Sequence, residues 1–201
     1  MNPVIQAQLR EFTTSASLTK DSQDTNFEIY SIFSIINGHL GESVDAYDVH
    51  LKGDEFGLDG IAILIQGELV QNLQDAQDKL SVIKSPSIEF IFFQSKSSEK
   101  FDYGDISKFF DAIIGFFSGD LCGESDVIDE LILAKNKIYE KLTGKRNPKI
   151  SCYYVTTGNY EKPTRIEKLK RDFRRDLEKE NIFDISTIKI EVSAHPGPSI
   201  S

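Results

Sequence analysis

The chain is poor in cysteine and histidine, and each shortage excludes a class of site. Two cysteines in 201 residues, Cys122 and Cys152, are too few and too far apart for a disulfide framework or a zinc cluster, so we expect two buried reduced thiols. The three histidines, His39, His50 and His195, stand apart from any serine or cysteine at a motif spacing. A catalytic triad is therefore not indicated.

Long hydrophobic runs are also missing. No apolar stretch approaches the roughly 18 residues that a membrane-spanning helix needs, and residues 1–22 lack the basic-then-apolar pattern of a secretory signal. We therefore expect a cytoplasmic protein that does not associate with membranes. With 39% hydrophobic residues, the chain is long enough for one domain with its own core.

Positive charge is scarce in total but concentrated in one region. The net charge is −9, yet residues 131–180 contain 14 lysines and arginines against 7 acidic residues. The local field matters more than the total for attracting a polyanion, so a nucleic-acid partner stays open. The same pattern fits a solvated helical surface equally well.

The hydrophobic periodicity predicts an α/β protein with a mixed central sheet flanked by helices. Residues 1–24 are expected to form a polar N-terminal segment with a short helix over 3–12, and residues 25–201 the main domain. Helix signals cover residues 24–36, 105–117, 124–142 and 164–180, with a surface helix or long loop at 71–81. Strand signals cover residues 44–51, 59–66, 88–96, 149–156 and 186–192.

Polar residues stand at the edges of two of these strands. Asp59 opens an apolar run over 61–65, and Gln94 and Lys96 close another over 88–93. A lysine in a hydrophobic strand loses hydration unless a carboxylate, a phosphate or a metal-bound water faces it. Asp59 could supply that carboxylate. The alternative is a turn aspartate and a strand-end lysine with no joint role.

An aspartate at the head of one strand and a Gln-x-Lys on the next resemble the active site of the PD-(D/E)xK nuclease superfamily, in its variant with Gln in place of the second acid. The resemblance implies a restriction-endonuclease-like fold and a Mg²⁺ or Mn²⁺ cofactor. Asp59 would be the central metal ligand and Gln94 an amide-oxygen ligand. Lys96 would orient or deprotonate the attacking water and stabilise charge on the phosphate.

Two further ligands are suggested by the same resemblance. Superfamily members commonly carry a glutamate on the helix before the aspartate strand, and Glu28, expected in the first turn of helix 24–36, matches that position. Its charge would compensate for the acid missing at Gln94, although helix dipoles also favour an ordinary acid there. Ser95 faces the other side of its strand, but its backbone carbonyl could ligate the metal.

A narrower family is indicated by four segments, 57–63, 92–97, 101–106 and 153–158. Together they resemble the N-terminal region of AIPR proteins, which are associated with abortive infection and phage resistance in bacteria. The similarity covers about residues 25–160, with Leu58 where the superfamily has its proline. It implies antiphage defence by nucleic-acid cleavage. Because family members usually extend well beyond this length, we expect an N-terminal fragment or an unusually short member.

The helix over 164–180 offers a candidate nucleic-acid surface. Lys168, Arg171 and Arg175 project opposite its apolar stripe and could bind phosphates, or could form a solvated face. DNA is favoured over RNA, and a homodimer stays open. Two functions follow: a metal-dependent nuclease, or a catalytically weak or inactive nuclease-fold module that binds nucleic acid or a partner protein.

Overall fold

The computed structural model describes residues 3–16, 21–39, 44–53, 56–142, 148–179 and 185–193, so His195 lies outside the described part of the chain. The described helices are α1 (Pro3–Ser15), α2 (Gln23–His39), α3 (Leu73–Val82), α4 (Tyr103–Ser118), α5 (Asp126–Lys141) and α6 (Thr164–Lys179), with short 3₁₀ turns η1 (Ala46–Asp48) and η2 (Ile185–Thr187). The described strands are β1 (Gly60–Ile65), β2 (Glu68–Val70), β3 (Ile88–Lys96), β4 (Lys149–Thr156) and β5 (Ile188–Ser193).

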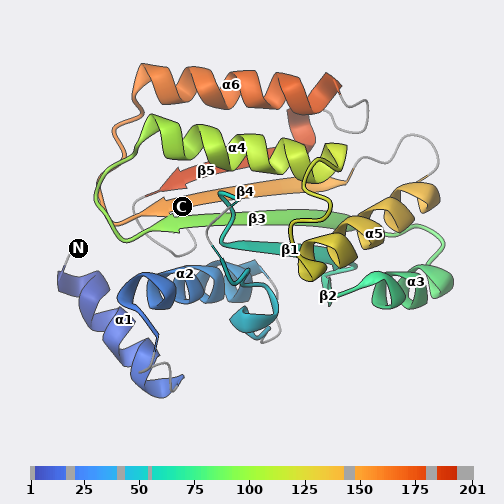
Figure 1. Cartoon of the computed structure of the whole chain (residues 1–201), viewed down its shortest axis with the longest axis horizontal. Coiled ribbons are helices and arrows are strands. Elements are labelled where there is room, and N and C mark those ends of the chain that lie inside the picture. The colour runs from blue at the N-terminus through green and yellow to red at the C-terminus, as the bar shows by residue number, and fades with distance from the viewer. Residues whose placement is uncertain are drawn as a thin grey trace.

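The strands form one mixed sheet in the order β2-β1-β3-β4-β5. β1 runs antiparallel to both β2 and β3, whereas β3, β4 and β5 run parallel to one another. Figure 1 shows α4 and α6 over one face of this sheet and α1 and α2 over the other, with α3 and α5 near the end where β3 begins. The expected α/β class, with a mixed sheet flanked by helices, is confirmed. No helix in the described ranges is long and apolar enough to cross a membrane.

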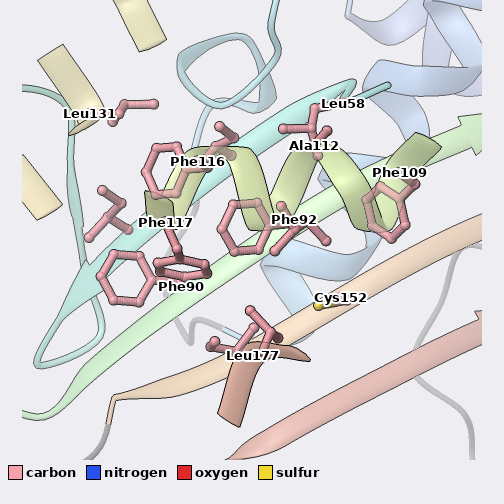
Figure 2. Close-up of a cluster of buried hydrophobic side chains, with 14 of the residues drawn as sticks. Leu58, Phe90, Phe92, Phe109, Ala112, Phe116, Phe117, Leu131, Cys152 and Leu177 are labelled. Carbon is pink, nitrogen blue, oxygen red and sulfur yellow. The ribbon is translucent and has the colours of Figure 1, made fainter. Parts of the chain in front are cut away.

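The core lies on both faces of the sheet, which explains the continuous apolar runs of its central strands. Phe90 and Phe92 of β3 point to the α4 side, and Figure 2 shows them beside Phe116 and Phe117 of that helix. The rings of Phe92 and Phe116 pack edge to face with centroids 5.5 Å apart. Alternate residues of the same strands join a second cluster with α1 and α2: Ala62, Leu64, Ile91 and Phe93. Gln94 and Lys96 continue the α4 side of β3, and Ser95 continues the α2 side.

The strand expected over 44–51 is wrong. This segment contains η1 and a single bridge between His50 and Gly60. Asp45 causes the difference, because its side chain accepts a hydrogen bond from the backbone N–H of Tyr47, 3.0 Å away, and starts a tight turn. Only the end of the segment therefore reaches the sheet.

The boundaries of α2 also differ from the expectation. The hydroxyl of Ser22 accepts a hydrogen bond from the backbone N–H of Thr25 at 3.1 Å, so the helix starts at Gln23. It ends at His39, which means that Asn37 and Gly38 do not stop it. Glu28 therefore lies in the second turn of α2 rather than the first. The helix dipole favours acids mainly in the first turn, so it does not explain an acid at this position.

Lys135 of α5 is buried at 3% exposure and ties this helix to the C-terminal end of α4. Its Nζ donates hydrogen bonds to the carbonyls of Phe116 and Phe117, 3.0 and 2.8 Å away. We expect Lys135→Ala to lower the free energy of unfolding by about 2–4 kcal/mol in urea titrations, because two buried carbonyls lose a charged donor. Lys137→Ala on the same helix, where the side chain is more exposed, should change it by less than about 0.5 kcal/mol. Equal losses would contradict this role for Lys135.

Candidate functional site

Backbone pairing places Asp59 beside the end of β3. Gly60 lies opposite Phe93 in the antiparallel ladder, so the head of β1 meets the C-terminal end of β3. The N–H of Asp59 donates to the carbonyl of Phe93, and its own carbonyl accepts from the N–H of Leu51, both at 2.8 Å. Backbone hydrogen bonds to neighbouring segments on both sides thus hold Asp59 in place, independently of the contacts of its side chain.

Two glycines let this segment pass between α4 and α2. Gly57 has a φ of 75°, and a Cβ there would lie 3.2 Å from the backbone carbonyl of Lys108 in α4. A Cβ on Gly60 would lie 2.9 Å from Ile32 of α2 and 3.0 Å from the carbonyl of Val49. The close approach on both sides fixes where Asp59 enters the sheet.

The side chain of Asp59 is 2% exposed and bound by two residues of β3. Gln94 Nε2 donates to Oδ1 at 2.9 Å, and the N–H and hydroxyl of Ser95 donate to Oδ2 at 2.5 and 2.9 Å. An ionised carboxylate only accepts, so the ionised form of Asp59 requires the observed orientation, with the amide nitrogen of Gln94 toward it and Oε1 away from it. That oxygen is buried and has no hydrogen-bond partner among the described residues.

The electrostatics join Asp59 to Glu28 and Lys96. Burial, followed by the negative charge of Glu28, raises the pKa of Asp59 from 3.8 to about 7. The hydrogen bonds from Ser95 and the charge of Lys96 act in the opposite direction without cancelling the rise. A buried carboxyl with a strongly raised pKa and a second acid nearby is typical of a functional site.

Glu28 is held by a histidine that we expected to be isolated. Nε2 of His50 donates to Oε2 of Glu28 over 2.9 Å, and their side chains are only 5% and 21% exposed. The two residues are 22 positions apart, and His50 reaches Glu28 because its segment bridges to Gly60. The only feature of the sequence that points to His50 is its place in a strand-like segment, and this feature does not identify Glu28 as its partner.

Lys96 lines two cavities. One, of about 720 Å³, lies along α4 and is lined by Gln94, Lys96 and Lys108 among others. The other, of about 150 Å³, lies along the start of α2 and is lined by Glu28, Ser95 and Lys96 among others. Gln94 and Glu28 therefore open into different cavities, while Asp59 contacts the strand between them.

The candidate metal ligands do not form a ready cluster of acids. Within the described ranges, no three His, Cys, Asp or Glu side chains gather in a way that could hold an ion. The oxygen donors around Asp59 are its own carboxylate, that of Glu28 and the amide oxygen of Gln94. Ser95 uses its N–H and hydroxyl to orient Asp59. The arrangement thus offers two carboxylates and one unsatisfied amide oxygen.

The basic residues of α6 are not brought to this site. Lys168 and Arg175 each pair with Asp172, over 3.9 Å in the case of Lys168. Both are well exposed, as is Arg171, and none of the three lines either cavity. Part of their charge is neutralised locally, which favours the solvated-surface interpretation over phosphate binding.

Comparisons of the chain with protein-family models, with curated proteins and with solved structures return no match. The features of the chain that bear on its function are therefore the geometry and electrostatics around Asp59, together with the resemblance carried by the sequence motifs.

Proposed function

We propose that this chain is a metal-dependent nuclease that hydrolyses phosphodiester bonds, in DNA rather than RNA, with a restriction-endonuclease-like fold. The observation that best supports the proposal is the buried Asp59–Gln94 pair with the amide oxygen turned away from the carboxylate. This pair joins the ends of two hydrogen-bonded strands, as the superfamily pattern requires, with Glu28 and Lys96 in electrostatic reach of Asp59. The resemblance to AIPR proteins is the reason to propose a role in antiphage defence.

The donor set suits a hard divalent cation. Mg²⁺ and Mn²⁺ prefer oxygen ligands. Asp59 and Glu28 would hold the ion through carboxylate oxygens, and Gln94, whose amide oxygen is turned away from Asp59 and which lines the other cavity, would have to reorient to add its amide oxygen. A bound ion of this kind would supply Lewis acidity and lower the pKa of a coordinated water. The buried amide oxygen and the repulsion between two acids are both features that a cation would relieve.

The protein groups have separable tasks in this proposal. Ser95 fixes the orientation of Asp59 by two hydrogen bonds, and His50 fixes that of Glu28 by one. Lys96, which lines both cavities, can donate to a phosphate oxygen and orient the attacking water. Its ammonium charge would act where negative charge develops during hydrolysis.

The test is incubation of the purified chain with supercoiled plasmid, linear duplex DNA, single-stranded DNA and RNA, each with Mg²⁺, Mn²⁺ or EDTA. We expect metal-dependent cleavage of DNA that EDTA abolishes, and no cleavage by Asp59→Asn protein purified in parallel. Binding without cleavage in any metal would instead support the alternative, a nuclease-fold binding module. The amide at Gln94, and the lack of a third acid at the site among the residues that the structure describes, would explain it.

Replacing the amide ligand by an acid should strengthen metal binding. Gln94→Glu adds a negative oxygen donor beside Asp59, so we expect Mg²⁺ to bind about tenfold more tightly in calorimetry. Without metal the same variant should be less stable than the wild type, because it brings a further acid against a buried carboxyl. Gln74→Glu on the exposed surface of α3 is the matched control and should leave the affinity unchanged. Unchanged affinity in Gln94→Glu would count against a ligand role for this residue.

A further inference from the structure

Tyr154 lies next to Gln94 in the sheet. The two residues are partners in the parallel register of β3 and β4, and both belong to the α4 side of the strands. Tyr154 is 0% exposed, yet its hydroxyl has no hydrogen-bond partner among the described residues. Its neighbour Gln94 has the same property at Oε1. Two unsatisfied polar atoms thus stand on adjacent strands and on one face.

Buried tyrosine hydroxyls and buried amide oxygens are nearly always hydrogen-bonded, either to protein or to an ordered water. A water needs two to four polar partners, and this pair supplies an acceptor at Gln94 and a donor or acceptor at Tyr154. Gln94 also lines the cavity of about 720 Å³, so solvent-filled space lies next to this buried pair. In the metal-free protein, one shared water would satisfy both atoms.

Burial and the acidic residues nearby keep the hydroxyl of Tyr154 protonated. It interacts electrostatically with the carboxylates of Asp105, Asp102 and Asp59, and its ring packs on Phe109 with centroids 5.9 Å apart. Burial, followed by these carboxylates, raises the pKa of Tyr154. At neutral pH the side chain is therefore a neutral phenol that forms hydrogen bonds but does not act as a base.

We propose that the hydroxyl of Tyr154 and Oε1 of Gln94 bind one water molecule, and that Tyr154 thereby positions the Gln94 amide with Nε2 on Asp59. A water donating to Oε1 favours the observed amide orientation over the flipped one, in which the amide oxygen would face a carboxylate. Tyr154 is then a positioning residue of the site. Its effect on catalysis rests on the proposed nuclease function, whereas the water site does not.

The test uses Tyr154→Phe, which removes only the hydroxyl and should keep the fold, as a thermal melt will show. Tyr153→Phe is the matched control, because that hydroxyl is bound by Lys189 and its ring packs on the α2 side of the same strand. In the metal-free wild type, a high-resolution crystal structure should contain a water bonded to both groups. The side-chain amide of Gln94 should give sharp, slowly exchanging NMR signals in the wild type and in Tyr153→Phe. In Tyr154→Phe we expect the water to be lost and these signals to broaden.

In the cleavage assay, Tyr154→Phe should lower kcat about tenfold with little change in KM, since it disturbs the orientation of Gln94 rather than substrate binding. Absence of the water, or an amide signal that is the same in all three proteins, would overturn this inference and leave the nuclease proposal standing. A wild type that holds the water but cleaves no nucleic acid would support the water site and overturn the nuclease proposal. Unchanged kcat in Tyr154→Phe would overturn the positioning role.

Discussion

Asp59→Asn should make the metal-free protein more stable at pH 8, by a few kcal/mol, and this gain should shrink as the pH falls toward 4. The pKa of Asp59 rises from 3.8 to about 7 on folding. Between these values the folded state holds a proton that the unfolded state has released, so stability falls as the pH rises through this window. At about 1.4 kcal/mol per pKa unit, the accumulated cost above pH 7 reaches a few kcal/mol. The asparagine amide of the variant does not titrate, so the variant does not lose this stability.

The hydrogen bonds of the site can survive this substitution. The amide oxygen of the variant can still accept from the N–H and hydroxyl of Ser95, and its amide nitrogen can donate to Gln94 Oε1 after the glutamine flips. Urea unfolding in EDTA from pH 4 to 8.5 measures the effect, with Asp111→Asn on the exposed surface of α4 as the control. A difference that does not depend on pH, or a loss of stability at pH 8, would show that Asp59 is not strained in the folded protein.

The same variant should lose metal binding and, in the proposed nuclease, at least about 100-fold of its cleavage rate. Higher stability with lower activity is the pattern expected of a residue that the fold tolerates for function. A structural aspartate would show the opposite, because removing a partner from a satisfied buried network lowers stability.

The sequence predicts those elements of the fold that local pattern determines. The strands at 88–96 and 149–156 match β3 and β4 to the residue, because both are buried on both faces and their polar ends stand out clearly. The antiparallel pairing of β1 with β3 is enough to bring Asp59, just before β1, beside Gln94 near the end of β3. The predicted site residues on the sheet are therefore adjacent in space.

Other parts depend on contacts that are distant in the sequence. His50 meets Glu28 only because Asp45 turns the preceding segment into η1, and Tyr154 meets Gln94 only through the β3–β4 register. The hairpin to β2 was also missed, although Gln66 and Gly67, with φ values of 55° and 82°, form a tight two-residue turn. Pattern analysis detects a strand or a helix, but it does not specify which side chains face each other.

The sequence alone also bears on the two interpretations of the basic residues on α6. Asp172 stands four residues after Lys168 and three before Arg175, the spacing at which helical side chains form ion pairs. The basic face of α6 therefore carries its own counter-charge. A candidate phosphate-binding surface should be examined for acids at these spacings before it is assigned to a polyanion.

Lys96→Ala should abolish cleavage by the proposed nuclease and leave its stability almost unchanged. Lys96 lines both cavities, so a phosphate and the attacking water bound in either one would be within reach of its ammonium group. Loss of a positioned acid–base or electrostatic group typically lowers the rate by about 100-fold or more. Its charge contributes less to the pKa of Asp59 than the hydrogen bonds of Ser95 do, so Asp59 keeps its main partners in the variant.

Thermal melts in EDTA and cleavage assays in Mg²⁺ or Mn²⁺ should be run on the wild type, Lys96→Ala and Lys100→Ala. Lys100 is exposed in the loop that follows β3 and lines neither cavity. Lys100→Ala should therefore change neither the melting temperature nor the cleavage rate. We expect the melting temperature of Lys96→Ala to hold or rise, because a half-buried charge no longer needs solvation. A marked fall in stability would instead mean that Lys96 is a structural partner of the buried acids. If no wild-type cleavage accompanied that fall, the binding-module alternative would replace the enzyme.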